Sequence, residues 1–142
     1  MDFTNGNFAN YNKINKVNNN VLRYMLARDT KIYKDTFELA KYVFGVTKKI
    51  KAEYRATIAR RIEDLTLQLS MKIVEANLCP PNSDERVRVL GRDFILVQEQ
   101  LFFLLALSQD KKIIDEKSHA NIARRLDEVG REATGWRKAT MK

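Results

Sequence analysis

Four stretches of this chain repeat apolar side chains at alternating steps of three and four residues, the spacing that places them on one face of an α-helix. The stretches cover about residues 21–50, 55–77, 84–109 and 116–134. Each pattern is long enough for a packed helix, and the connections between them are short. The sequence therefore predicts an all-α fold, an up-down four-helix bundle.

Turn residues mark two of the corners between these helices. Pro80 and Pro81 follow the second stretch, and proline stops a helix because it lacks a backbone N–H. Ser83 then has the features of an N-cap, with two acidic residues in the first turn of the third helix. The first corner, near residues 50–54, contains no proline, so a turn and a nearly continuous helix are both open there.

The first 20 residues differ in composition from the rest, because eight of them are Asn. Asn side chains compete with helical hydrogen bonds, so this stretch is a poor helix former. We expect residues 1–20 to form a flexible Asn-rich N-terminal tail, an expectation favoured over a binding arm. Residues 21–142 are expected to form the bundle domain.

The charge balance favours an anionic partner. The chain has 26 Lys and Arg against 18 Asp and Glu, a net charge of +8, and nucleic acid is the usual partner of such a surplus. Lys34, Lys41 and Lys48 are spaced by seven residues and share one helix stripe, although a merely solvated face has the same pattern. The first predicted phosphate-binding set is Lys31, Lys34, Lys41, Lys48, Lys49 and Arg55.

A second basic set lies in the fourth stretch, at Arg124, Arg125, Arg131, Arg137 and Lys138. Adjacent residues diverge by about 100° on a helix, so one of Arg124 and Arg125 is also a candidate for a structural ion pair. No aromatic-rich recognition motif interleaves with these charges in the sequence. We therefore expect phosphate contacts with little sequence preference.

The second half of the third stretch, residues 101–107, is apolar on every side. Such a helix needs cover all round, from the bundle or from another subunit. We expect a symmetric homo-oligomer, with the interface at Leu101, Phe102, Phe103 and Leu105. Trp136 is expected in the core or in that interface, and Gly91 at a close approach of a neighbouring helix.

Catalysis is not indicated by the residues. A di-iron bundle needs two Glu-x-x-His motifs, and this chain has one, Glu116 to His119, which contains its single histidine. Cys79 has no evident base, and no glycine-rich phosphate loop is present. We expect no catalytic residue, no metal and no cofactor. The lone cysteine and the lack of a long apolar run also predict a soluble protein, without a membrane partner.

Two segments resemble a known family. The first is Ile58-Ala59-Arg60-Arg61-Ile62-Glu63-Asp64-Leu65 together with Ile73-Val74-Glu75-Ala76-Asn77, and the second runs from Leu126 to Lys138 and includes Glu128-Val129-Gly130-Arg131 and Gly135-Trp136. With the four-helix pattern they resemble the accessory variability determinant proteins of diversity-generating retroelements, over about residues 21–138. Those proteins are grouped with the four-helix bundles encoded by intervening sequences in bacterial 23S rRNA genes. Thr134 departs from the Gly that the family often has at its position.

The resemblance implies a non-catalytic accessory factor in the bacterial cytoplasm, encoded by a bacterium or a phage. It would bind the reverse transcriptase of the retroelement and template-repeat RNA, and possibly DNA, to support adenine-directed mutagenic reverse transcription. The family also implies a homopentamer. The alternative is a stand-alone bundle of the rRNA intervening-sequence type that acts as an RNA-binding or protein-interaction module.

Overall fold

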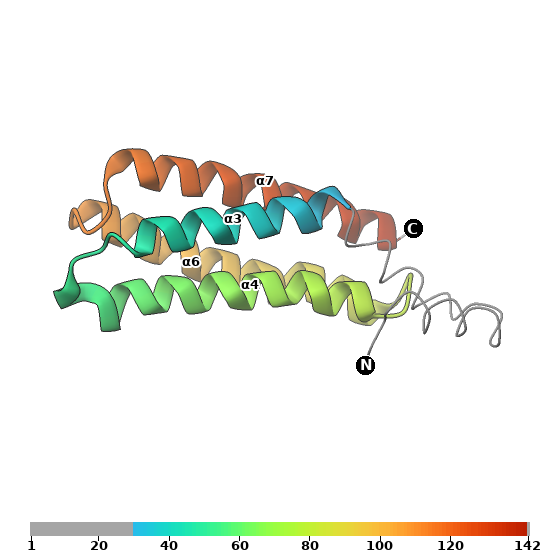
Figure 1. Ribbon diagram of the computed structural model, residues 1–142. Coiled ribbons are helices and arrows are strands. Elements are labelled where there is room, and N and C mark those ends of the chain that lie inside the picture. The colour runs from blue at the N-terminus through green and yellow to red at the C-terminus, as the bar shows by residue number, and fades with distance from the viewer. Residues whose placement is uncertain (1–29, 142) are drawn as a thin grey trace, which may run out of the picture.

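The computed structural model describes residues 30–141, and all regular secondary structure within that range is helical (Figure 1). Four helices form the body of the fold: α3 (Lys31–Thr47), α4 (Arg60–Leu78), α6 (Phe94–Asp110) and α7 (Glu116–Thr140). Shorter helical segments complete the connections: η1 (Ala52–Tyr54), η2 (Arg55–Ala59), α5 (Asp84–Arg88) and η3 (Val89–Asp93). The expected tail at residues 1–20 and the expected start of the first helix lie outside the described residues.

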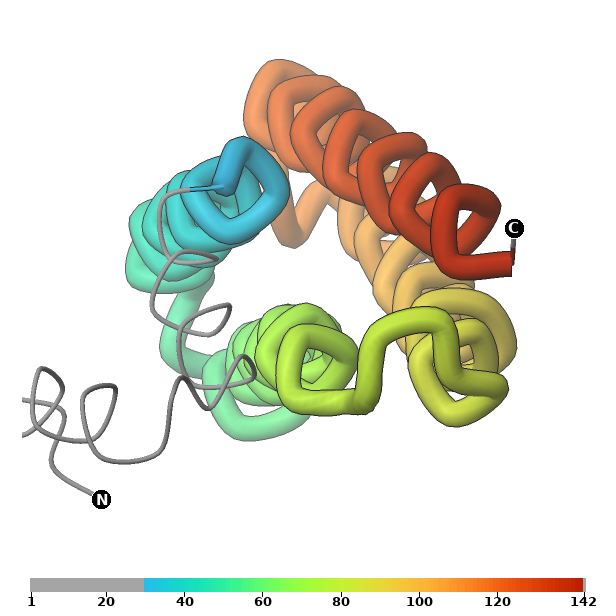
Figure 2. Tube along the Cα trace, turned by 90° about the vertical axis from the view of Figure 1, so that its right-hand side faces the viewer, coloured from blue at the N-terminus to red at the C-terminus, as the bar shows by residue number. Residues whose placement is uncertain are grey.

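Successive long helices run in opposite directions, and each packs against the next one in the chain (Figure 1). Seen along the bundle axis, α3, α4, α6 and α7 follow one another around a square, and α7 closes it against α3 (Figure 2). The predicted up-down four-helix bundle is confirmed. Within residues 30–141, no helix is both long enough and apolar enough to span a membrane.

The corner between α3 and α4 is a turn, which decides between the two alternatives left open by the sequence. The Ile50 N–H donates to the Thr47 carbonyl over 3.1 Å, and the Tyr54 N–H donates to the Lys51 carbonyl over 3.0 Å. The π-helical segment η2 then leads directly into α4. The predicted second helix, 55–77, therefore corresponds to η2 and α4 together.

Arg86 joins three elements at the opposite end of the bundle. Its Nε donates to the Ala76 carbonyl over 2.8 Å and its Nη2 to the Cys79 carbonyl over 3.0 Å, so it satisfies carbonyls at the end of α4. Its guanidinium lies 5.2 Å from the ring centroid of Trp136 on α7. Ser83 caps α5 as predicted, because its Oγ accepts from the Arg86 N–H over 3.1 Å. Trp136 packs against the core, as one of its two expected positions requires.

The predicted end of the fourth helix at residue 134 is wrong, because α7 continues to Thr140. The buried face continues through Ala133, Trp136 and Thr140, and this burial holds the last turns in the helix. Gly135 does not interrupt it. Gly91, in the predicted third helix, does mark a close approach: a Cβ there would lie 3.0 Å from Cδ of Arg137 on α7.

The core is formed by apolar side chains from all four long helices, including Leu39, Ile62, Phe94, Leu101 and Leu126, which are at most 1% exposed. Full burial of such a side chain contributes about 1.5–3 kcal/mol relative to leaving it in water. One polar contact ties α3 to α4 beside this core: Thr47 Oγ1 donates to Glu63 Oε2 over 2.6 Å. The bundle therefore fixes which helix faces are left for function.

Candidate nucleic-acid interface

One outward face of α3 carries alternating lysine and phenylalanine residues, which we call the α3 stripe: Lys34, Phe37, Lys41, Phe44 and Lys48. All five residues are exposed. Steps of three and four residues keep them within about a quarter of the helix circumference. The inward face of the same helix is buried through Thr36, Leu39, Val43 and Thr47, so packing fixes the orientation of the stripe.

The cations of the α3 stripe are nearly free of carboxylates. Among residues 30–141, Lys34 and Lys48 make no ion pair, and Lys41 approaches only Glu38, with 3.4 Å between Nζ and Oε1. The Lys41 side chain is 61% exposed, so that pair is weak in water. Three positive charges therefore face solvent at seven-residue intervals, about 10.5 Å apart along the axis.

The sequence contains no aromatic-rich recognition motif, but two aromatic side chains lie between the lysines on this face. Phe37 is 57% exposed and Phe44 is 39% exposed, and each lies between two lysines of the stripe. Lys41 Nζ lies 6.0 Å from the centroid of the Phe37 ring. The spacing of residues 34–48 contains this pattern, but spacing alone does not tell whether a phenylalanine on a helix is exposed or buried.

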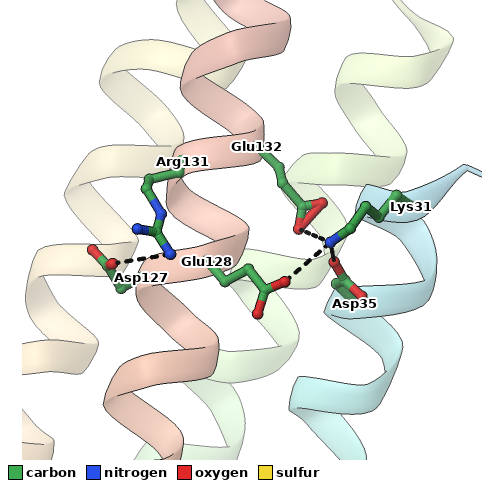
Figure 3. A network of polar contacts seen from close by, with 6 residues as sticks. All are labelled: Lys31, Asp35, Asp127, Glu128, Arg131 and Glu132. Atoms are coloured by element: carbon green, nitrogen blue, oxygen red, sulfur yellow. Dashed lines mark hydrogen bonds and ion pairs between the residues drawn. The ribbon is translucent and has the colours of Figure 1, made fainter.

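Lys31 is placed apart from the other lysines, in a group of carboxylates between α3 and α7 (Figure 3). Its Nζ lies 2.5 Å from Oδ2 of Asp35, 3.0 Å from Oε1 of Glu128 and 3.7 Å from Oε1 of Glu132. We call these four residues the acidic seam. The seam carries more negative than positive charge, which disfavours the predicted phosphate contact at Lys31.

Glu132 is the unusual member of the acidic seam. Its carboxylate oxygens are buried and accept no hydrogen bond from residues 30–141. Burial raises the pKa of Glu132 to about 7, and the neighbouring Asp35 carboxylate adds to the effect. The pKa of Asp35 is lowered, first by hydrogen bonding to the Glu132 carboxyl group and then by hydrogen bonding to the Lys31 ammonium. Near neutral pH, Asp35 and Glu132 therefore share one proton, which resides mainly on Glu132.

The acidic seam does not favour a bound metal ion, because the Lys31 ammonium already occupies it. Carboxylate oxygens of Asp35, Glu128 and Glu132 lie within 4.8 Å of one another, and they are the one group of potential metal ligands in the described part of the chain. The Lys31 ammonium already contacts all three carboxylates. We interpret the seam as an ion-pair group that joins two helices.

The remaining residues of the first basic set lie at the corner between α3 and α4. Lys49 and Arg55 are exposed, and Arg55 Nη2 donates to the Ile50 carbonyl over 3.3 Å. Lys49 lies near Asp115 at the start of α7, whose pKa is lowered mainly by hydrogen bonds from Ser118 and also by this lysine. Both residues extend the positive surface beyond Lys48 at one end of the bundle.

The outward face of α7 carries a second basic stripe in the same register. We call it the α7 stripe: Arg124, Asp127, Arg131, Thr134 and Lys138. Arg124, Arg131 and Lys138, three of the predicted phosphate ligands, are exposed. Arg131 Nη2 lies 3.6 Å from Oδ2 of Asp127, so an acidic residue partly neutralises the centre of this stripe.

Arg125 and Arg137 turn away from this stripe. The Arg125 guanidinium lies 5.0 Å from the ring centroid of Tyr42 on α3, and both Arg125 and Arg137 have a buried Nε without a hydrogen-bond partner in residues 30–141. Arg137 packs against Gly91, as described above. Both side chains are half-buried, so the prediction that they bind phosphate is corrected to a packing role between helices.

A shallow groove of about 500 Å³ lies between α6 and the α7 stripe. Arg131 and Lys138 line it together with two acidic residues, Glu99 and Asp127. Gly130 forms part of its wall, where a Cβ would come within 2.2 Å of the Gln98 side chain. The mixed charge of the lining makes this groove a poorer anion site than the α3 stripe.

The four residues of the predicted subunit interface on α6 differ in their exposure to solvent. Leu101 and Leu105 are 0% exposed within the single chain, so the prediction that they contact another subunit is wrong. Phe102 is half-buried against the core. Phe103 is 72% exposed and remains available for such a contact.

The two residues considered for catalysis lie apart from any basic stripe. Cys79 is buried at the end of α4, where its Sγ donates to the Glu75 carbonyl over 3.3 Å, and burial raises the pKa of its thiol. A raised pKa disfavours the thiolate that a nucleophile requires. His119 is half-buried in the second turn of α7.

Comparison of the chain with protein-family models and with curated proteins finds no match.

Proposed function

We propose that this chain is a non-catalytic accessory protein of a diversity-generating retroelement. In this role it binds the reverse transcriptase together with template-repeat RNA or its cDNA, and it supports adenine-directed mutagenic reverse transcription. The resemblance at residues 58–77 and 126–138 supports the assignment to a retroelement, and the α3 stripe supports binding of nucleic acid. The single observation that carries the proposal is the row of three exposed lysines on α3, two of them without an ion pair in residues 30–141.

Phosphate is the anion that such a row suits best. A nucleic-acid strand repeats its negative charges at a regular interval, and cations on a rigid helix meet several of them without first being ordered. Lysine contacts a phosphate as a point charge and reads no base. The expected binding is therefore strong at low salt and tolerant of sequence.

A filter-binding titration with template-repeat RNA at two salt concentrations tests the nucleic-acid part. Counterion release predicts a log–log slope of about −0.7 for each phosphate contacted on a single strand. Three lysines of the α3 stripe therefore account for a slope of about −2. A wild-type protein that binds neither RNA nor DNA at low salt contradicts the proposed function.

Copurification with the reverse transcriptase tests the protein part. The tagged chain, expressed together with a reverse transcriptase of a diversity-generating retroelement, is expected to retain the enzyme at a salt concentration that removes RNA. An assay for adenine-directed changes in the variable repeat, with and without the chain, then measures the function itself. Loss of those changes without the chain is the expected result, and unchanged mutagenesis contradicts it.

A second function is favoured by a separate observation on α4. Leu67, Met71 and Leu78 are each at least 44% exposed and lie on one outward face of that helix. Such a face is typical of a protein-interaction module, as in the alternative of a stand-alone bundle of the rRNA intervening-sequence type. Retention of the reverse transcriptase supports the retroelement function, and retention of other proteins with no effect on mutagenesis supports the alternative.

We also propose that the chain forms a homo-oligomer, a pentamer by the resemblance. Phe103 supports this assembly, since it is 72% exposed, and Leu96 and Leu107 lie on the same side of α6. Light scattering at micromolar concentration measures the mass directly. A particle of 16.5 kDa, the mass of one chain, contradicts the proposal.

A further inference from the structure

We infer that the α3 stripe binds single-stranded nucleic acid, with Phe37 and Phe44 as platforms on which bases stack. This inference rests on the proposed function and names its substrate class: a strand whose bases are unpaired. It is carried by the alternation of exposed rings and exposed cations along one face of a rigid helix.

The two kinds of side chain serve the two parts of a nucleotide. Lys34, Lys41 and Lys48 offer charge to the phosphates, and each phenylalanine lies between two of these cations. Lys41 Nζ lies 6.0 Å from the Phe37 ring centroid, so a cation and a ring lie next to each other on this face. A strand that lies along the helix can therefore place a phosphate at Lys41 and a base on Phe37.

The exposure of the rings is what separates this face from an ordinary solvated one. A single exposed apolar residue on a surface needs no explanation. Here two rings repeat with the same seven-residue period as the lysines, so they share the register of the charges. Each ring carries cations on both sides along the helix, and that surrounding favours an anionic strand over an apolar protein surface.

Base pairing decides whether the rings can take part. In a duplex the faces of the bases are stacked on one another, and only the phosphates are open to the lysines. In a single strand the faces are free, and stacking on an aromatic side chain tolerates any base because every base has a π-face. The stripe is therefore expected to prefer single strands over duplexes and to accept both RNA and DNA, since it offers no dedicated reader of the 2′-hydroxyl.

Fluorescence polarisation with the full chain tests the inference. The probes are a labelled mixed-sequence RNA of about 15 nucleotides, the DNA of the same sequence, and the matching duplexes, a length within the range of known single-strand sites. The variant is Phe37→Leu/Phe44→Leu, which keeps apolar side chains but removes the rings. Leu67→Ala/Met71→Ala is the control, because it changes two exposed apolar side chains on the outward face of α4 and leaves every ring and cation of the α3 stripe in place.

The double variant is expected to lose about tenfold or more in affinity for both single strands, from the loss of two stacking contacts. Its affinity for the duplexes and its salt slope are expected to stay unchanged, because no phosphate contact is removed. Leu67→Ala/Met71→Ala is expected to bind every probe as the wild type does. Circular dichroism of each variant checks that the helices remain folded.

A second variant, Phe37→Trp/Phe44→Trp, reports on stacking directly. Single-strand affinity is expected to be retained, and quenching of the added tryptophan fluorescence is expected on binding. If the leucine variant binds single strands as tightly as the wild type, the rings are not platforms and the inference is overturned. If the wild type binds no probe at all, the proposed function itself fails, so the two failures are distinguishable.

Discussion

The outward faces of α3 and α7 carry basic residues in the same register but differ in what lies between them. Positions 34, 41 and 48 of α3 and positions 124, 131 and 138 of α7 are all Lys or Arg, spaced by seven residues. The two positions between the cations are Phe37 and Phe44 on α3. On α7 they are Asp127 and Thr134.

This difference teaches that a basic stripe alone does not define a binding face. A positive stripe attracts anions from a distance, and both faces carry one. On α7, Asp127 is 3.6 Å from Arg131 and offsets part of that attraction, while on α3 the intervening residues add contact surface instead. The acidic seam lies between α3 and α7, on the other side of α7 from the Asp127–Arg131 pair of the α7 stripe (Figure 3). We therefore expect the strand to follow α3.

Charge reversal on each stripe gives the largest expected effect. The variants are Lys34→Glu/Lys41→Glu/Lys48→Glu on α3 and Arg124→Glu/Arg131→Glu/Lys138→Glu on α7, which lower the net charge equally. Loss of three phosphate contacts is expected to weaken RNA binding by about a hundredfold on α3, and by less than about tenfold on α7. Filter binding at low salt measures both. Equal losses would mean that net charge alone drives binding.

The acidic seam gives the next effect, on stability. Because folding raises the pKa of Glu132 from its ordinary 4.5 to about 7, the folded state holds the proton more tightly than the unfolded state. Stability is therefore lost as pH rises through this window. The free energy of unfolding is expected to fall by about 2 kcal/mol between about pH 5 and pH 8.5, given about 1.4 kcal/mol for each pKa unit and some screening by solvent.

Urea unfolding at the two pH values measures this change, and Asp35, whose pKa is lowered, stays ionised across the range. Glu132→Gln keeps the side-chain shape and removes the titrating group, so the pH dependence is expected to vanish. A wild type equally stable at both pH values would contradict the assignment.

Grafting rings onto α7 tests the comparison in the other direction. Asp127→Phe/Thr134→Phe gives the α7 stripe the pattern of the α3 stripe, and Asp127→Leu/Thr134→Leu makes the same change in charge without rings. In a protein whose α3 lysines are reversed, the phenylalanine graft is expected to bind single strands about tenfold more tightly than the leucine graft. Fluorescence polarisation measures the ratio, and identical affinities would leave no role for the rings.

Asp127→Asn gives the smallest expected effect. It removes the carboxylate that faces Arg131, an exposed ion pair with 61% of the Asp127 side chain in solvent. Exposed pairs contribute about 0–1 kcal/mol, so the melting temperature is expected to change little. RNA affinity is expected to rise by less than about threefold, because a single charge is unmasked. A large rise would show that Asp127 hides a stronger site on α7.

The bundle could be predicted from the sequence because apolar periodicity depends on local spacing. The same periodicity could not divide the apolar residues of α6 or α3 between core and surface, since that depends on which neighbours the bundle supplies. The pattern thus places Leu101 at an interface although it lies in the core, and it does not mark Phe37 and Phe44 as exposed. The carboxylates around Lys31 could not be predicted for a related reason: two of the three, Glu128 and Glu132, lie about a hundred residues away in the chain.

The contacts of Arg86 link the last turns of α7 to the corner between α4 and α5, in the middle of the sequence. The carbonyls of Ala76 and Cys79 and the ring of Trp136 meet on one guanidinium, so the middle of the chain and its end are ordered together. Removal of residues 135–142 would strip the ring from that guanidinium, and amide hydrogen exchange would then quicken at the end of α4 although no residue of α4 had changed. The C-terminal turns of α7 therefore stabilise a corner that precedes them by some fifty residues in the sequence.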